Sequence, residues 1–201
     1  MGTSWVSEPN KNLLCSVFVV FDDLPVAKQV SINYAVSLAV IRTLNRYCLP
    51  KLSVKWPNDI LSYSQKLCGI LVENVIQSNK VKSSVIGVGI NVNQIKYPSY
   101  LHNVTSMKLI LKKDIDLEEL LSFFLEELKN KLANISEGKS TTLKKEYLSF
   151  LYKKNIPTMF KNSRDVLFMG KIVGVSSDGK LQIQMEDDSI SEFGIKEVSI
   201  A

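Results

Sequence analysis

The 201-residue sequence predicts an α+β fold, in which a mixed or antiparallel sheet is packed by helices and a small β-barrel follows at the C-terminus. Two patterns support this class. Strand-like apolar runs succeed one another between residues 52 and 92 with only short turns between them, which is typical of antiparallel neighbours. After residue 155, short apolar runs alternate with Gly and Asp turns, which is typical of a small barrel.

The N-terminal part predicts one strand followed by one long helix. The apolar, β-rich run at residues 13–21 (LLCSVFVVF) predicts a buried strand. Residues 22–25 (DDLP) favour the start of a helix, because acidic side chains stabilise the positive end of the helix dipole and Pro fits the first turn. Apolar residues at helical spacing continue to residue 48, and Pro50 ends the helix.

A group of strands and then two more helices are expected in the middle of the chain. The strands are predicted at residues 52–56, 60–63, 69–76 and 84–92. Asn79-Lys80 is the expected tip of a hairpin between the last two strands. Asp116 then begins a helix, with Glu119 in capping-box position, and a further helix is expected at residues 141–152.

The C-terminal barrel is expected to contain short strands at residues 166–169, 172–175, 181–185 and 191–193. A hairpin is expected at Asp178-Gly179, because Asp-Gly is a favoured two-residue turn. The change in character near Asn155 predicts two domains, residues 1–154 and residues 155–201.

Composition argues against several classes of function. The net charge is +5, but the lysines are dispersed among acidic residues and no zinc-finger or helix-turn-helix pattern accompanies them, so no nucleic-acid partner is expected. No apolar run approaches membrane-spanning length, so no membrane partner is expected. Without a recognisable targeting segment, the expected location is the cytoplasm.

The cysteines and the histidine argue against metal and triad chemistry. Cys15, Cys48 and Cys68 stand among apolar residues and are expected to be buried thiols in a reducing compartment. His102 is the only histidine, which excludes a His-rich metal site and weakens any Ser/His/Asp or Cys/His triad. No resident metal site is predicted.

Residues 55–60 (KWPNDI) are the strongest candidate for a functional site. A strand end followed by Pro-Asn-Asp is common in turns, so a purely structural role stands beside the functional one. The functional interpretation rests on the whole set, since lysine, amide and carboxylate groups meet at the end of a sheet. These groups suit the binding of a nucleotide phosphate beside a small carboxylate.

Two further segments extend this candidate site. Lys66 precedes an apolar strand, where it is either a solvated lysine or a compact positive charge for phosphate, and Gly69 permits close approach of a ligand. Residues 87–93 (GVGINVN) contain a Gly-x-Gly pattern, which is either a bulge or a flat backbone on which a ligand lies, with Asn91 offering a hydrogen bond. Trp5 either stacks on a purine or belongs to the core.

The order and spacing of residues 55–60, 66–73 (KLCGILVE) and 87–92 resemble the biotin–protein ligases (biotin–[acetyl-CoA-carboxylase] ligases). Residues 4–9 (SWVSEP) resemble the segment after that family's Gly- and Arg-rich loop. The terminal β module resembles the family's small SH3-like domain. The resemblance spans essentially the whole chain and implies the class II synthetase-like biotin/lipoate ligase fold.

The resemblance implies a two-step reaction. The carboxylate of biotin attacks the α-phosphate of ATP to give biotinyl-5′-AMP and pyrophosphate, with Mg²⁺ as cofactor. The ε-amine of one lysine on a biotin carboxyl carrier protein, a subunit of acetyl-CoA carboxylase, then displaces AMP. Such an enzyme positions two anions and offsets their repulsion, which agrees with a site that holds lysines, Asp and Asn.

The resemblance also assigns roles to individual residues. Lys66 would bridge the biotin carboxylate and the α-phosphate, while Asn58 and Asp59 would orient the phosphate, Mg²⁺ or the incoming lysine. These three form the expected catalytic set. The ATP and adenylate site would contain Trp5, Lys55, Asn58, Asp59, Lys66 and Asn91. The biotin site would contain Lys66, Gly69, Leu71, Gly89 and Ile90.

The sequence departs from the family pattern at its start. Family members carry an upstream Ser-Thr-Asn stretch and a Gly-Arg-Gly-Arg-type loop, whereas this sequence begins at residues 1–4 (MGTS), within the expected end of that loop. A ligase with an N-terminal truncation is therefore expected, with weak binding of biotin or ATP by this chain alone. The alternatives are a catalytically impaired remnant that binds the carrier protein, and a lipoate–protein ligase relative, against which residues 55–60 argue. The sequence leaves open whether the chain forms a homodimer.

Overall fold

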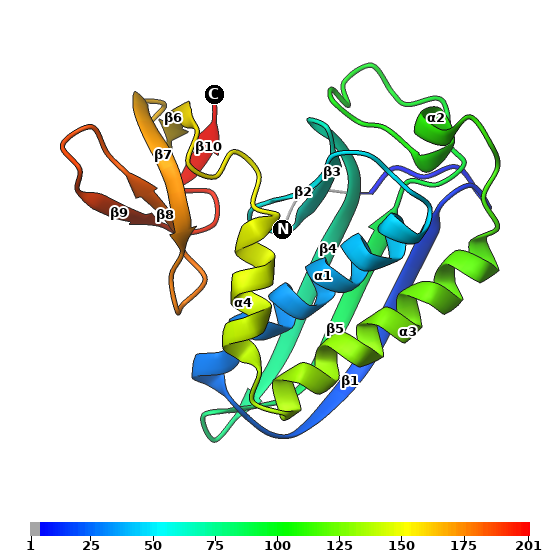
Figure 1. The fold of residues 1–201 in the computed structure, drawn as a ribbon, viewed down its shortest axis with the longest axis horizontal. Coiled ribbons are helices and arrows are strands. Elements are labelled where there is room, and N and C mark those ends of the chain that lie inside the picture. Colours follow the sequence, from blue (N-terminus) through cyan, green and yellow to red (C-terminus); the bar gives the residue numbers. More distant parts are fainter. Residues whose placement is uncertain (1–4) are drawn as a thin grey trace.

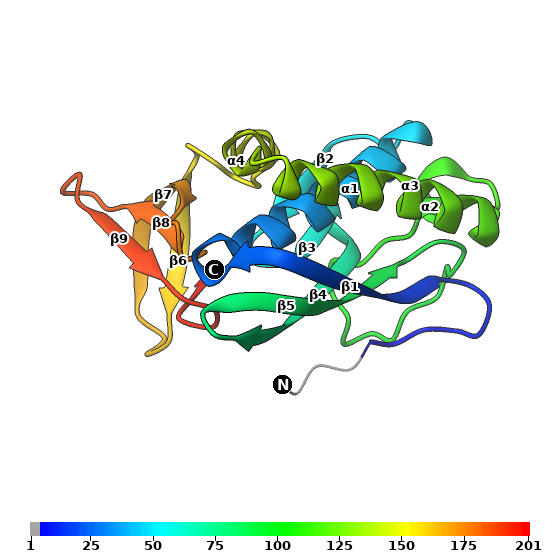
Figure 2. The ribbon, with the colours of Figure 1, turned by 90° about the horizontal axis from the view of Figure 1, so that it is seen from below.

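The computed structural model describes residues 5–201 and consists of two antiparallel sheets with helices (Figures 1 and 2). The larger sheet has the order β1-β5-β4-β3-β2, and every neighbouring pair is antiparallel. Its strands are β1 (Leu13–Pro25), β2 (Leu52–Lys55), β3 (Asp59–Ser62), β4 (Gln65–Gln77) and β5 (Lys80–Ile90). The predicted α+β class is confirmed.

Helices cover only one face of the larger sheet, as the view from below shows (Figure 2). They are η1 (Val26–Lys28), α1 (Val30–Arg46), α2 (Met107–Leu111), α3 (Leu117–Ser136) and α4 (Ser140–Ser149). Helix α1 is buried along most of its length and forms the centre of the core against the sheet. As expected, Asp116 caps α3, where its carboxylate accepts hydrogen bonds from the backbone N–H groups of Glu118 and Glu119.

The second face of the larger sheet is left open by the helices. Burial alternates along β1 and β4, so that side chains such as Phe18 and Leu71 are exposed while Val88 on β5 is buried beneath the helices. The two glycines Gly87 and Gly89 belong to the open face of β5. A ligand can approach the sheet backbone from this side.

The C-terminal sheet has the order β10-β6-β7-β8-β9, and all of its described pairings are antiparallel. Its strands are β6 (Pro157–Asn162), β7 (Leu167–Val175), β8 (Leu181–Gln184), β9 (Ile190–Phe193) and β10 (Val198–Ile200). Asp178-Gly179 forms the expected hairpin turn between β7 and β8, with Gly179 at a φ of +87°. The domain division at residues 154/155 stays a prediction, although the new sheet begins at Pro157.

Several local expectations were wrong. Residues 22–25 complete β1 instead of starting a helix, because Leu24 and Pro25 pair with Val81 and Lys80 across a bulge. The two runs predicted at 166–169 and 172–175 form one strand, β7, since Gly170 lies against Ile183 within the sheet. The short elements α2, β6 and β10 were not predicted. Helix α2 and strand β10, of five and three residues, are too short for a periodic signal.

The cysteines also differ from expectation. Cys68 is buried, Cys15 is half-buried and Cys48 is exposed. Cys48 follows the last turn of α1 with a φ of +57°, so its side chain turns away from the apolar face of the helix. No helix among residues 5–201 is long and apolar enough to cross a membrane.

Candidate active site

An ion pair between Lys66 and Asp59 lies at the centre of the candidate site. The Nζ atom of Lys66 is 2.6 Å from Oδ1 of Asp59, and the two side chains are 37% and 23% exposed. The pair forms because β3 and β4 are adjacent, with Asp59 opposite Gly69 and Leu61 opposite Lys66 on either side of an irregularity in register. Lys66 therefore presents a half-exposed positive charge at the start of β4.

Trp5 and two glycines form a flat wall beside this charge. Gly69 and Gly89 lie opposite each other on β4 and β5, and a Cβ atom on either would come 2.9 Å from the Trp5 ring. The indole thus packs directly on the backbone of both strands, which only glycine allows. Lys66 Nζ lies 5.7 Å from the centre of a Trp5 ring. Trp5, Lys66, Gly69 and Gly89 are therefore brought together as expected.

A cavity of about 590 Å³ opens on this face of the sheet. Besides Trp5, five other expected site residues line this cavity, namely Asn58, Lys66, Gly69, Leu71 and Gly89. Further residues of β1, β4 and β5 complete its walls. The lining residues are Trp5, Leu14, Cys15, Ser16, Asn58, Lys66, Gly69, Ile70, Leu71, Glu73, Gly87, Val88 and Gly89. Its volume is within the range of small-molecule sites in proteins. Cys15 and Ser16 of β1 were not expected, since only the pairing of β1 with β5 brings them here.

Asn58 is locked against β4 by two hydrogen bonds. Its side-chain Nδ2 donates to the carbonyl of Ile70 over 2.8 Å, and its backbone carbonyl accepts from the N–H of Ile70 over 2.9 Å. The 55–59 turn is thereby held beside the strand that carries Lys66. Asn58 also lines the cavity.

Asn91 anchors a loop over the other side of Lys66. Asn91 is 3% exposed, and its Nδ2 donates to the carbonyl of Thr105 over 3.0 Å. In the same loop, the carbonyl of Asn103 accepts from the backbone N–H of Lys66 over 2.6 Å, and the N–H of Thr105 donates to the carbonyl of Lys66 over 3.0 Å. Asn91 therefore lies next to the site and acts chiefly on the loop.

This loop adds site residues that the sequence reasoning missed. A second cavity, about 90 Å³ in volume, lies between the loop and Lys66. It is lined by Trp5, Val6, Lys66, Asn91, Tyr97, Leu101 and Val104. Tyr97, Leu101 and Val104 belong to a segment without helical or strand periodicity, so their only signal was aromatic and apolar residues in an otherwise polar connection.

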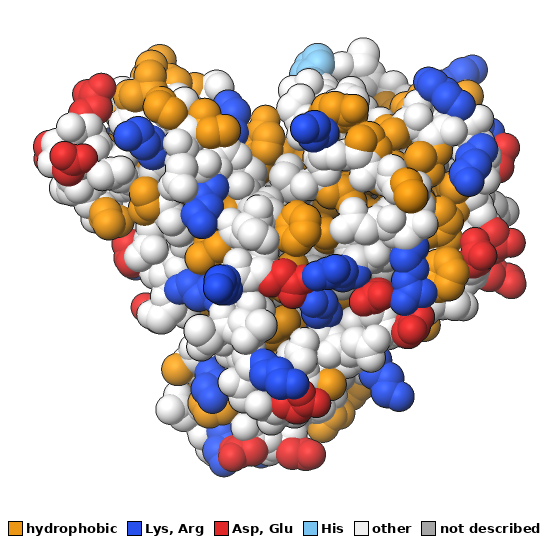
Figure 3. All heavy atoms as spheres, in the orientation of Figure 1, with side chains coloured by type: hydrophobic (Ala, Val, Ile, Leu, Met, Phe, Trp, Pro, Cys, Tyr) orange, Lys and Arg blue, Asp and Glu red, His pale blue; other side chains and the backbone are white. Residues whose placement is uncertain are grey.

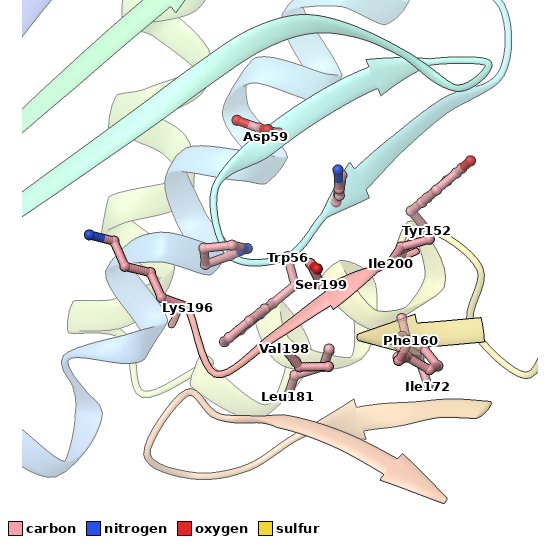
Figure 4. A pocket seen from close by; sticks show the side chains of 12 residues that line it. Trp56, Asp59, Tyr152, Phe160, Ile172, Leu181, Lys196, Val198, Ser199 and Ile200 are labelled. Carbon is pink, nitrogen blue, oxygen red and sulfur yellow. The ribbon is translucent and has the colours of Figure 1, made fainter. Parts of the chain in front are cut away.

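Three expected site residues, Ile90, Lys55 and Asp59, line neither of the two cavities beside Lys66. Ile90 was expected in the biotin pocket, but it is 0% exposed and packs in the core, because successive side chains on a strand face opposite sides and Gly89 faces the cavity. Lys55 does not line the large cavity. It lines a separate one of about 220 Å³ next to the C-terminal sheet, together with Asp59 (Figure 4).

The electrostatics favour charge stabilisation over covalent catalysis by the protein. Burial raises the pKa of the Cys15 thiol, and burial together with the nearby Asp59 carboxylate raises that of Cys68 well above its usual range. Both thiols are therefore protonated and weak as nucleophiles. Lys66 remains the cation that can neutralise an anion in the cavity. Over the face in Figure 3, basic and acidic side chains are interspersed.

Comparison with known proteins finds similarity to biotin and lipoate protein ligases. The model of the Biotin/lipoate A/B protein ligase family matches residues 1–91. The Bacillus subtilis protein named bifunctional ligase/repressor BirA is 27% identical over 202 residues, which cover 98% of this chain and 59% of the relative. The Mycobacterium tuberculosis biotin--[acetyl-CoA-carboxylase] ligase is 35% identical over 96 residues, which cover 46% of this chain and 34% of the relative.

The fold extends the similarity over the full chain. The structure of a biotin protein ligase from Aquifex aeolicus in complex with biotin and ATP aligns with a TM-score of 0.79 and 25% identity, covering 100% of this chain and 82% of that one. The sequence alignment with the Bacillus relatives covers 98% of this chain. The chain spans only 59% of the length of those relatives.

Proposed function

We propose that this chain, whose sequence and fold are those of a biotin–protein ligase catalytic domain, activates biotin with ATP and transfers it to a lysine of a carrier protein. The single observation that carries the proposal is the position of Lys66. Its ammonium, paired with Asp59, points into a cavity with a glycine floor and an indole wall. Such a cavity suits a flat, uncharged ring with a carboxylate tail.

The chemistry of the first step follows from this placement. The biotin carboxylate and the α-phosphate of ATP repel each other, so the reaction needs a cation between them. Lys66 supplies that charge, and its half-exposed position allows two anions to reach it from different sides. Asn58, held by Ile70, lines the same cavity and would orient the phosphate. The bond from the α-phosphorus to pyrophosphate then breaks as the carboxylate oxygen attacks.

The remaining assignments divide between the two cavities. Gly69, Leu71 and Gly89 bind biotin, whereas Trp5, Lys66 and the loop anchored by Asn91 bind the adenylate. Asp59 is the carboxylate that would hold Mg²⁺, since Mg²⁺ in nucleotide sites takes one or two carboxylates and completes its shell with phosphates and water. When bound, the ion would neutralise phosphate charge. Asp59 is held beside both cavities by its ion pair with Lys66, and it lines the neighbouring cavity of about 220 Å³.

The second step requires access for a protein substrate. The cavity opens on the face of the sheet that no helix covers, so the lysine of a carrier domain can approach the activated biotin (Figure 2). We assign the carrier role to a biotin carboxyl carrier protein, as in acetyl-CoA carboxylase, and the cytoplasm as the place of reaction. We also propose that residues 1–154 form the catalytic domain and residues 155–201 the small C-terminal domain.

The test is a transfer assay with the purified chain, biotin, MgATP and an apo carrier domain. We expect biotinylation of the carrier, and we expect Lys66→Ala to lower its rate by about a hundredfold or more. Lys80→Ala is the matched control, because Lys80 makes an ion pair of the same 2.6 Å length with Asp23 at the far end of the sheet.

Other outcomes point to other functions. Binding of the carrier without transfer by the wild-type chain would indicate a carrier-binding module instead of an enzyme. Competition by lipoate, with lipoylation of the carrier, would indicate a lipoate ligase. Equal activity of Lys66→Ala and wild type would remove the basis of the proposal.

A further inference from the structure

Trp56 joins the 55–59 turn to the C-terminal sheet. The Nε1–H group of Trp56 donates a hydrogen bond of 2.9 Å to the carbonyl of Gly179, which lies 123 residues away in sequence. Gly179 belongs to the hairpin turn between β7 and β8. Figure 4 shows Trp56 reaching from the turn between β2 and β3 toward the strands of the C-terminal sheet. Trp56, which lies in the same turn as Asn58 and Asp59, is thus hydrogen-bonded to the C-terminal sheet.

The hydrogen bond fixes the direction of an indole that packs only partly against the core. Trp56 is half-buried and lines two cavities, one of about 220 Å³ and one of about 210 Å³. Pro57, the next residue, has no backbone N–H with which to fix the turn. The indole N–H therefore adds a constraint on this end of the turn to those from the pairing of Lys55 with Asp59 and the bonds between Asn58 and Ile70.

The acceptor is itself held firmly. Gly179 has a φ of +87°, and a Cβ atom there would lie 3.1 Å from Cγ2 of Val30 on α1, so the hairpin tip rests against the helix. Within the turn, the Ser176 hydroxyl accepts from the backbone N–H groups of Asp178 and Lys180 over 3.3 and 3.1 Å. The carbonyl of Gly179 is therefore presented from a fixed position.

A second attachment limits movement of β2 at the start of the turn. The N–H of Val54 donates to the carbonyl of Phe150, and the N–H of Tyr152 donates to the carbonyl of Val54, each over 2.8 Å. These bonds tie β2 to the segment that leads into the C-terminal sheet. The turn is thus held at its base by the connecting segment and at Trp56 by the hairpin.

We propose that Trp56 is a positioning residue through which the C-terminal sheet holds Asn58 and Asp59 in register with Lys66. The inference rests on the proposed function. Trp56 does not itself contact the large cavity, and it acts through the two residues that follow Pro57. The C-terminal sheet thereby contributes to the rate of adenylate formation without supplying a residue to the biotin pocket.

The test compares Trp56→Phe with wild type in biotin-dependent exchange of pyrophosphate into ATP. Phe keeps an aromatic ring but lacks the N–H. We expect kcat to fall about three- to tenfold, as for the loss of one hydrogen bond, with the KM for biotin unchanged and the midpoint of thermal unfolding lowered by no more than about 4 °C. Ser176→Ala should give a smaller fall in kcat. Asp187→Ala is its matched control, because it removes the hydrogen bonds to Ser189 in the turn at the other end of β8 and should have no effect.

A second measurement does not depend on activity. NMR of the wild-type chain should show slow hydrogen exchange of the Trp56 Nε1–H group, and Trp56→Phe should shift the side-chain amide signals of Asn58. Wild-type kcat in Trp56→Phe, or unchanged Asn58 signals, would overturn the inference. So would a fall in kcat accompanied by a fall in the unfolding midpoint of more than about 10 °C, because that indicates general destabilisation. A wild-type chain without exchange activity refutes the proposed function instead, and the NMR signals then decide the positioning role alone.

Discussion

The Nζ atom of Lys66 lies 2.6 Å from Oδ1 of Asp59, at the junction of two cavities on the open face of the sheet. The carboxylate holds the ammonium in one place before any substrate binds. Because substrates meet a preset charge, little reorganisation is needed at the moment of reaction.

Replacing Asp59 with Asn should test this arrangement. The side chain keeps its size but loses the charge that positions Lys66, so we expect the rate of biotinyl-AMP formation to fall about 10- to 100-fold. Single-turnover measurement with radiolabelled ATP reports this step directly. The control is Asp23→Asn, which removes the same type of ion pair with Lys80 remote from the site and should leave the rate unchanged. Equal rates for Asp59→Asn and wild type would contradict the role of the pair.

The contact between Gly89 and Trp5 predicts an effect on biotin affinity. A Cβ atom at Gly89 would lie 2.9 Å from Cε2 of Trp5, so Gly89→Ala must push the indole away from the strand. We expect the Kd for biotin, measured by calorimetry, to rise roughly 5- to 100-fold.

Gly87 offers the matched control on the same face of β5. A Cβ atom there would meet Cβ of Leu71 at 3.6 Å, an ordinary contact. Gly87→Ala should therefore change the Kd no more than about twofold. An equal loss of affinity in both variants would indicate simple filling of the cavity and contradict Trp5 as its wall.

The loop anchored by Asn91 predicts a separate effect on ATP. Asn91→Ala removes the hydrogen bond to the Thr105 carbonyl and should raise the KM for ATP about tenfold or less, since one buried hydrogen bond is lost. Asn93→Ala is the control, because Asn93 makes two comparable bonds with the backbone of Ile115, outside both cavities. It should lower stability but leave the KM for ATP unchanged. A similar rise in both variants would argue against the loop as part of the nucleotide site.

A pH-dependent contribution to stability is expected from Glu146. Its carboxylate contacts Lys131 Nζ over 2.7 Å and also Arg42, joining α1, α3 and α4. Burial alone would raise the pKa of Glu146, but the hydrogen bonds from Lys131 and Arg42 outweigh it and lower this pKa below its ordinary value. A lowered folded-state pKa stabilises the fold above the unfolded pKa, and this stabilisation is lost as the pH falls through the folded pKa.

Glu146→Gln should therefore lower the free energy of unfolding by roughly 1–2 kcal/mol at pH 7 in urea titrations. The difference from wild type should shrink as the pH falls through the lowered pKa of the wild-type carboxylate, which then becomes protonated. Glu137→Gln is the control, since its pair with Lys139 is about half exposed and should contribute under about 0.5 kcal/mol. A pH-independent difference would contradict the charge-based explanation.

The sequence determined those features that depend on neighbours a few residues apart. Period-two alternation placed Gly69 and Leu71 on one face of β4, and local capping placed the start of α3 at Asp116. The 55–60 and 66–73 segments could be joined into one site, because a single short hairpin connects them. The same alternation should have placed Ile90 in the core, opposite to Gly89.

Only the tertiary structure decided which distant segments complete the site. Three features have no local signal in the sequence. Lys66 pairs with the loop at Val104, and Lys55 lies outside the large cavity. Trp56 donates a hydrogen bond to the carbonyl of Gly179. The physical reason is that side-chain periodicity and capping are set by the backbone geometry of one element. Contacts between elements depend instead on how the whole core packs, and that is a property of the full chain.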